Sequence, residues 1–276
     1  MTVLFDRKVR VQVDDFMIEG LDVAFEITKS LSPKTPNAAE VRIWNLNAEH
    51  RKRLQELENV YVSLEAGYVG GTSLLFRGDL RDVLSTREGT DWVTTITSDS
   101  GRRARKRRIL KSFAPGATVE DVLKAAAKAM GVNLGNTAAK TVSAKIQGTQ
   151  ASKFFNGYAL AGAIEGELDR LARSCGLEWS VQDDELQFLD QGMPLQELGI
   201  KLSPETGLIG SPEPGNKGIT EARCLMIPDL FPGRRIQITS EHVTGIYRAE
   251  TTKHVGDTAG HDWYVDLELR NEERKR

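Results

Sequence analysis

Residues 35–83 read TPNAAEVRIWNLNAEHRKRLQELENVYVSLEAGYVGGTSLLFRGDLRDV and combine strand, helix and hairpin patterns. Polar and apolar residues alternate over Glu40–Trp44, which predicts a half-buried strand. A charged stretch from about Asn47 to Leu57 favours a short helix. A second alternating strand, Tyr61–Glu65, enters a glycine turn and returns through Leu74–Phe76. These apolar positions need a common core, and no residue among them resembles a catalytic centre, so the segment is typical of a shape-holding unit.

The flanking sequence continues the β pattern in both directions. Valines alternate with polar residues over 9–13, and a second alternating run covers 21–27. The polar, proline-bearing stretch 30–37 is typical of a loop, and Trp92–Thr97 is rich in β-branched residues. Residues 1–100 are therefore predicted to form an antiparallel β domain with one small helix.

The periodicity becomes helical after residue 117. Thr118 can cap a helix that ends at Gly131, and a second helix is predicted from about Asn156 or Tyr158 to Cys175. A strand is expected around 141–146, and alternating residues over 177–188 predict a hairpin that turns at Asp183-Asp184. Residues 101–191 are thus expected to form a small α+β domain.

Proline and glycine punctuate the last part of the chain, and four short strand patterns lie between them, at 222–227, 235–240, 245–254 and 263–269. Such spacing suits a second small barrel or sheet. The predicted fold class is therefore α+β and mainly β, with domains at 1–100, 101–191 and 192–276.

Composition excludes several classes of protein. The 276 residues carry 37 basic and 39 acidic side chains, a formal net charge of −2, so no bulk field favours nucleic acid or membrane as the main partner. Cys175 and Cys224 are too few for a disulfide framework and lack zinc-site spacing. The sequence shows no signal-peptide core and no run of roughly 18 apolar residues. We expect a protein that is made and folded in the cytoplasm and has no membrane span.

One basic run stands out between the first two predicted domains. Closely spaced guanidinium groups could bind phosphates, but the run has no interleaved aromatic residues that would stack on bases. A solvated strand edge or a protein interface explains it as well. We interpret it as a partner-binding patch for another protein or for DNA; its residues are Arg102, Arg103, Arg105, Lys106, Arg107 and Arg108.

Other candidate chemistry gives no site. His254 and His261, with nearby Asp257 and Asp262, lack the spacing of a metal site and suit a hairpin connection. The acidic residues of the second helix are expected on a solvated face. Cys175 suits the core. The acidic residues of that helix are Glu165, Glu167 and Asp169. We predict no catalytic residue, no cofactor and no metal ligand, and hence a protein that is not an enzyme.

Several stretches resemble the baseplate or tail hub proteins of tailed bacteriophages and related contractile injection systems. They are AAEVRIWNLNAEHRKRL, VSLEAGY and LLFRGDLRDV in the first domain, then ETGLIGSPEPGNKGI, IPDLFPGRRIQITS and TGIYRAETTKHVGDTAGHDWYVDLEL in the last. The resemblance implies a homotrimer in which each protomer supplies two tail-tube-like antiparallel β-barrels flanking an α+β insertion. The six barrels would form a pseudo-sixfold ring that joins a sixfold tail tube to a threefold spike or central fibre.

The same resemblance implies the partners and the location. The partners would be copies of the chain, a tail tube or distal tail protein, the spike or central fibre, tape-measure protein and, in transit through an axial channel, DNA. The location would be the baseplate or tip of a virion tail, assembled in host cytoplasm. Strands at Val60–Leu64 and Gly245–Thr252 are expected to form the ring. Two alternatives remain open: a cell-wall hydrolase or peptidase of the tail tip, and a DNA-binding accessory protein.

Overall fold

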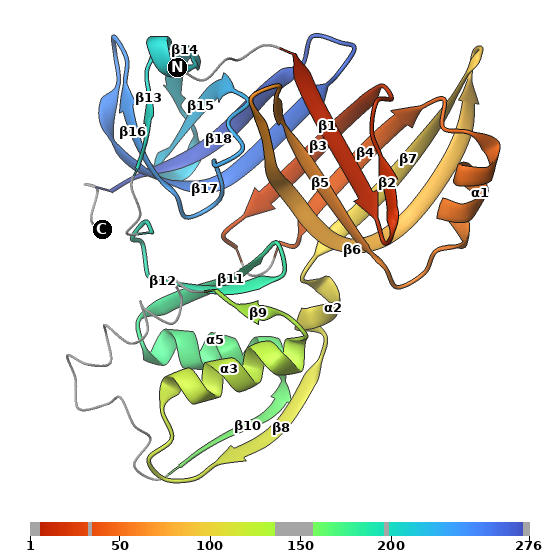
Figure 1. The fold of residues 1–276 in the computed structure, drawn as a ribbon. Helices are drawn as coiled ribbons and strands as arrows, with labels where there is room; N and C mark the ends of the chain where they lie inside the picture. The colour runs from red at the N-terminus through yellow and green to blue at the C-terminus, as the bar shows by residue number, and fades with distance from the viewer. Residues whose placement is uncertain (1–5, 33–34, 136–156, 196–198, 273–276) are drawn as a thin grey trace.

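A computed structural model describes residues 6–32, 35–135, 157–195 and 199–272. The fold is α+β and mainly β. Two β units lie side by side, and a smaller unit with two longer helices hangs from them (Figure 1). No helix of the described residues is long and apolar enough to cross a membrane.

The N-terminal β unit forms around the segment 35–83. Its helix α1 (Ala48–Glu56) begins where the Asn47 side chain accepts a hydrogen bond from the His50 N–H at 2.8 Å. Leu54 is the buried residue of this helix. The strands are β1 (Arg7–Val13), β2 (Phe16–Ile18), β3 (Val23–Ser30), β4 (Asn37–Trp44), β5 (Tyr61–Tyr68), β6 (Gly71–Glu88) and β7 (Asp91–Ser100).

The C-terminal β unit contains two more strands than the sequence predicts. Short runs around the prolines pair with their neighbours, and two 3₁₀ turns, η2 (Pro204–Thr206) and η3 (Asn216–Gly218), connect them. The strands are β13 (Ile200–Leu202), β14 (Leu208–Pro214), β15 (Ile219–Leu225), β16 (Arg235–Thr239), β17 (Thr244–Asp257) and β18 (Trp263–Asn271).

Strand β17 joins the two β units into one sheet. Its first residues pair with β16, a bulge follows between Ala249 and Thr251, and the remainder, 251–257, pairs antiparallel with β3. Alternate residues of both units then point into a single hydrophobic core. The strand order β14-β15-β18-β17-β3-β4-β7-β6-β5-β1-β2 has two ends, so pairing among the described strands gives no closed barrel.

The α+β unit has its own core between two layers of strands. Helices α3 (Val119–Met130) and α5 (Ile164–Ser174) lie between the ribbon β8–β10 and the sheet β11-β12-β9 (Figure 1). Thr118 and Asp121 form a capping box, and Gly131 ends α3 in a left-handed conformation. The remaining elements are α2 (Arg102–Arg105), β8 (Arg108–Phe113), β9 (Asn133–Leu134), β10 (Tyr158–Ala163), β11 (Leu177–Gln182) and β12 (Glu185–Asp190).

The second predicted helix is too long at its start. Residues 158–163 form β10, which pairs with β8, and the helix begins only at Ile164. Leu160 is buried in β10, and an apolar residue at this position also fits the stripe of a helix, which is why the pattern is misleading. The predicted strand at 141–146 lies outside the described residues. The division into three domains stays a prediction.

Candidate functional site

The basic run does not form one surface. The Arg102 side chain lies outside the described part of the structure. Arg105 is only 7% exposed, and burial lowers the pKa of its guanidinium. Lys106, Arg107 and Arg108 are exposed, the last in strand β8. The sequence-predicted patch is therefore split between the junction of two units and their surface.

Arg103 lies in an ion network at the neck between the N-terminal β unit and α2. Its Nη1 atom is 3.4 Å from Asp79 Oδ1, and burial raises the pKa of that carboxyl group. Arg81 pairs with Asp99 in the same network. Gly78 allows β6 to lie close to β7 beside this network, because a Cβ at residue 78 would lie 2.6 Å from the Asp99 carbonyl oxygen.

A tight turn of the α+β unit inserts two aspartates into the N-terminal β unit. Asp183 and Asp184 both have positive φ, as a two-residue hairpin turn requires. Asp183 Oδ2 lies 2.6 Å from Lys29 Nζ, and Asp183 Oδ1 accepts a hydrogen bond from the Arg77 N–H. Arg77 Nε lies 3.2 Å from Asp184, and burial raises the pKa of Asp184 to about 6.

Polar contacts continue along the same boundary. The Asn37 amide donates to the Val181 carbonyl at 3.2 Å and to Gln182 Oε1 at 2.7 Å, and Gln182 donates to the Ser30 carbonyl at 2.9 Å. A buried polar contact needs matched donors and acceptors, so these bonds specify how the α+β unit docks.

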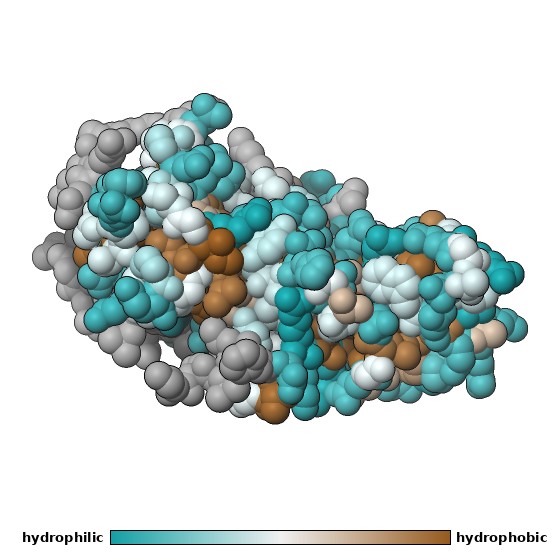
Figure 2. All heavy atoms as spheres, turned by 90° about the horizontal axis from the view of Figure 1, so that it is seen from above, coloured by the Kyte–Doolittle hydropathy of each residue, from teal (hydrophilic) through white to brown (hydrophobic). Residues whose placement is uncertain are grey.

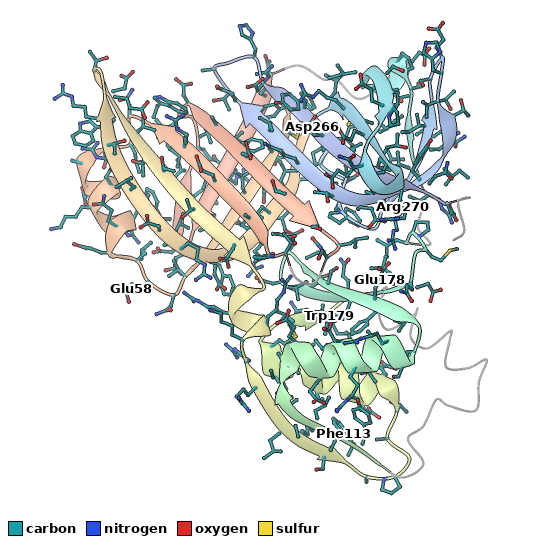
Figure 3. The ribbon with its side chains drawn as sticks, turned by 180° about the vertical axis from the view of Figure 1, so that it is seen from behind. Glu58, Phe113, Glu178, Trp179, Asp266 and Arg270 are labelled. Atoms are coloured by element: carbon teal, nitrogen blue, oxygen red, sulfur yellow. The ribbon has the colours of Figure 1, made fainter. Side chains whose placement is uncertain are left out.

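Arg248 makes the corresponding contact with the C-terminal β unit. Its buried guanidinium pairs with Glu178 of β11 and, at 2.6 Å, with Glu250; Arg270 also reaches Glu250 at 3.1 Å. Figure 3 shows Glu178 on the α+β unit and Arg270 on the C-terminal β unit above it. The α+β unit is thus held by charged side chains of both β units.

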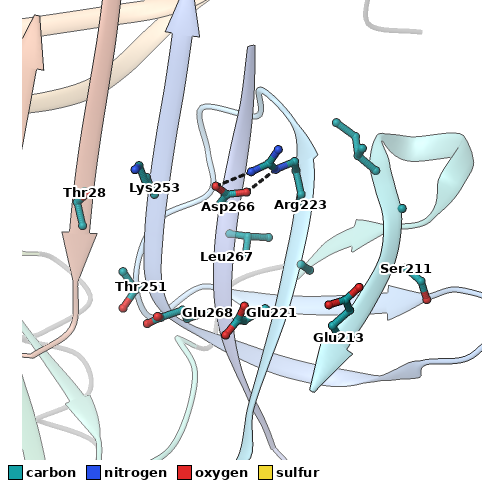
Figure 4. Close-up of a pocket in the computed structure, with 13 residues that line it drawn as sticks. Thr28, Ser211, Glu213, Glu221, Arg223, Thr251, Lys253, Asp266, Leu267 and Glu268 are labelled. Carbon is teal, nitrogen blue, oxygen red and sulfur yellow. Dashed lines mark hydrogen bonds and ion pairs between the residues drawn. The ribbon is translucent and has the colours of Figure 1, made fainter. Parts of the chain in front are cut away.

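The face of the large sheet that points away from the core carries an open groove of about 700 Å³. Three glutamates, Glu213, Glu221 and Glu268, are directly opposite one another on β14, β15 and β18. Beside them Arg223 donates to both oxygens of Asp266, at 2.6 and 3.0 Å (Figure 4). Like charges in register destabilise a sheet, so this row is not explained by stability.

Of the residues that the sequence offered as candidates for chemistry, His254, Asp257 and Cys224 are buried or bonded within their own turn. His254 is buried in the core, and burial lowers the pKa of its imidazole to about 3. Asp257 accepts backbone N–H groups within its own turn. Burial raises the pKa of the Cys224 thiol to about 12. Within the described residues, no cluster of three or more histidine, cysteine or acidic side chains could hold a metal.

The acidic face expected on α5 is only partly solvated. Glu167 is buried and pairs with Arg170, because the helix is covered on two sides. Asp169 accepts a hydrogen bond from the Trp179 indole at 2.8 Å. Sequence reasoning missed the junction contacts altogether; the Asp183-Asp184 turn was predicted, but nothing local to it signals Lys29 or Arg77 as partners.

Comparisons with known proteins find a baseplate hub family and solved structures of tail proteins. A family model described as baseplate hub gp41 matches residues 3–243. No curated protein sequence matches the chain. The fold is similar to a 43 kDa tail protein of prophage MuSo2 from Shewanella oneidensis, with a TM-score of 0.65 at 11% identity over 96% of this chain and 98% of that one.

Two further solved structures share the fold. A tail protein from Neisseria meningitidis gives a TM-score of 0.63 at 9% identity, over 97% of each chain. An E. coli component of the type VI secretion system, described as structurally similar to two T4 bacteriophage tail proteins, gives 0.57 at 11% identity, over 97% of this chain and 77% of that one. At such identities the likeness concerns the fold.

Proposed function

Because the chain belongs to the baseplate hub gp41 family, we propose that three copies form a pseudo-sixfold ring that joins the sixfold tail tube to a threefold spike or central fibre. The role is structural, and the protein acts at the tail tip of a virion assembled in host cytoplasm. The observation that carries this proposal is the β3–β17 pairing, which fuses two β units into one sheet with one core.

The joining of two β units in one chain would allow a threefold assembly to match a sixfold tube. A ring of three identical chains has three equivalent surfaces, whereas a sixfold tube presents six. In the proposal each β unit of one protomer takes the place of one tail-tube-like barrel, so three chains offer six similar positions. A rigid shared core keeps the two units of a chain from moving independently.

The polar face of the shared sheet is proposed to line an axial channel. Residues in direct register share a face of a sheet, which places more acidic than basic side chains here. Excess negative charge repels the phosphate backbone, which suits a channel that DNA and tape-measure protein pass through without binding. The charged residues of this face include Glu26, Glu40, Asp82, Glu213, Glu221, Asp266 and Glu268, with Arg42, Arg223 and Lys253.

The exposed part of the basic run is proposed to contact a protein partner. Lys106 and Arg107 follow α2, and Arg108 begins β8; both elements lie below the two β units (Figure 1). Arg103 and Arg105 are committed to the neck. The tail tube or distal tail protein would meet one end of the ring, and the spike or central fibre the other.

Mass in solution tests the proposal. The purified chain, alone and co-expressed with the tube and spike proteins of the same particle, is measured by multi-angle light scattering and imaged by negative stain. We expect a trimer and a ring with a central hole. A chain that stays monomeric with both partners overturns the proposal. Lysis of cell walls in a turbidity assay would instead support a hydrolase, and a salt-sensitive gel shift a DNA-binding protein.

A further inference from the structure

We propose that the ring closes where β6 of one copy meets β14 of the next, with Leu84 of the first copy packed against Ile209 of the second. This inference rests on the proposed trimer and names its contact. Each residue belongs to an unpaired edge of the same sheet, and the two edges lie at opposite ends of the β layer (Figure 1).

Strand β6 is only half covered. Residues up to Asp79 pair with β5, whereas 82–88 pair with β7 alone, so among the described residues no strand lies on the other side of the outer half of β6. Helix α1 and the loop after it contact β6 up to Val83, and Leu84 lies beyond that contact. Strand β14 pairs with β15 alone within the described part of the chain. Free strand edges are sites where another chain adds.

The strands expected from the sequence to form the ring have no free edge. Strand β5 lies between β1 and β6, and the segment 245–252 of β17 lies between β18 on one side and β16 or β3 on the other. Their backbone groups are used within the protomer. A contact in which strands of two copies lie edge to edge would therefore use other elements.

Strand direction permits closure. From β14 to β6 the sheet runs through eight strands, β14-β15-β18-β17-β3-β4-β7-β6, and every neighbouring pair is antiparallel. With an even number of alternating strands, β14 and β6 run in opposite directions. A second copy placed beside the first therefore continues the antiparallel alternation across the junction.

Leu84 and Ile209 expose apolar side chains on the same face. Leu84 is 57% exposed and Ile209 is 42% exposed. Cross-strand register places both on the polar face, away from the core. The row of Leu84 runs through Thr95, Arg42 and Ala24, and that of Ile209 through Arg223, Asp266, Lys253 and Thr28.

The two rows are staggered, as closure requires. They meet β3 at Ala24 and Thr28, four residues apart, which is roughly 13 Å along a strand. Strands of a closed sheet tilt against its axis, so a row that leaves one copy meets the next copy at a shifted level. The shift brings β14 beside the free half of β6 and not beside the half that β5 covers.

Side chains must carry this contact. Pro212 and Pro214 have no N–H to donate, so the edge of β14 cannot complete a hydrogen-bonded ladder. Single exposed apolar residues are common on any surface. Two of them, at the two outer strands of one face, fit a contact between copies. Figure 2 shows that the surface seen from above is mostly hydrophilic with separate hydrophobic patches.

Cross-linking tests the contact. We would make Leu84→Cys with Ile209→Cys in a Cys175→Ser background, and treat the assembled particles with a short bis-maleimide. We expect covalent dimers and closed trimers on a denaturing gel. The matched control pairs Leu84→Cys with Leu110→Cys, since Leu110 is a more exposed leucine of β8; it should not cross-link between copies.

A charge exchange gives a second readout. Leu84→Lys or Ile209→Asp alone should weaken trimerisation at least tenfold, and the double variant should restore it, while the monomers stay folded because both positions are exposed. Trimers that form without the 84–209 cross-link, or with an equal 84–110 cross-link, overturn this contact and leave the ring intact. Chains that never trimerise with tube and spike proteins instead overturn the proposed function.

Discussion

Lys29 Nζ and Asp183 Oδ2 lie 2.6 Å apart, although 154 residues separate them, and the Lys29 side chain is only 3% exposed. This ion pair joins strand β3 to the turn between β11 and β12. It places the α+β unit directly below the strand at which the two β units meet.

Removal of one partner should therefore destabilise the protein. Lys29→Met leaves the Asp183 carboxylate without its cation, and loss of one member of a buried pair costs about 3 kcal/mol. We expect the midpoint of urea unfolding to fall accordingly. Lys29→Met with Asp183→Asn should cost less than the sum of the single changes. Strict additivity of the two changes would show that the pair is not coupled.

His254 should make the protein acid-sensitive. Burial holds its folded-state pKa at about 3, against 6.5 in the unfolded chain. A lowered histidine pKa means that the unfolded state takes up the proton first, so stability is complete above pH 6.5 and falls by about 1.4 kcal/mol per pH unit below it. Unfolding by denaturant at several pH values measures this slope. His254→Leu should flatten it; an unchanged slope would contradict the assignment.

Asp184 should affect the pH dependence of stability in the direction opposite to His254. Its folded-state pKa is raised from 3.8 to about 6, so its contribution to stability is complete below pH 3.8 and is lost as pH rises through 6. Between pH 6 and 4 it therefore offsets the loss from His254. Asp184→Asn should steepen the decline of stability over this range, whereas the exposed Asp15→Asn should not. Parallel curves for Asp184→Asn and the unchanged protein would argue against the raised pKa.

Charge reversal should affect stability differently at the buried and the exposed residues of the basic run. Arg105→Glu places a buried negative charge near Asp99 and Glu165 and should destabilise the fold by about 3 kcal/mol. Arg107→Glu and Arg108→Glu change exposed groups, and each should alter stability by less than about 0.5 kcal/mol. Unfolding midpoints test the first expectation, and pull-down with tube or spike protein tests whether the exposed pair binds a partner.

The sequence predicted helix starts well where the capping residue and its backbone partner lie a few residues apart. Asn47 and Thr118 cap helices because their side chains bond backbone groups three residues on. Residues 158–163 were misassigned because the Leu160 position suits both a helix stripe and a strand. Pairing partners were not predictable: an alternating strand such as β3 shows which side is buried, but not that β17, more than 200 residues later, lies beside it.

The contact between β1 and the hairpin of β17 and β18 is also not predictable from sequence, because its residues lie about 250 positions apart. The Arg7 guanidinium donates to the carbonyl oxygens of Asp257 at 2.6 Å, Gly260 at 2.7 Å and His261 at 3.1 Å, and lies 5.3 Å from the centre of the Trp263 ring. Arg7→Lys keeps the charge but loses the planar fork that reaches several acceptors.

Both Arg7→Ala and Arg7→Lys should therefore lower stability, by about 1 to 3 kcal/mol, because charge-assisted hydrogen bonds are lost. Denaturant unfolding measures the change. Arg10→Ala on the same strand is the matched control, since Arg10 and its partner Glu19 are exposed and its loss should leave the midpoint unchanged. If Arg7→Lys unfolds like the unchanged protein, charge alone holds the hairpin; if it unfolds like Arg7→Ala, the directed hydrogen bonds hold the two β units together.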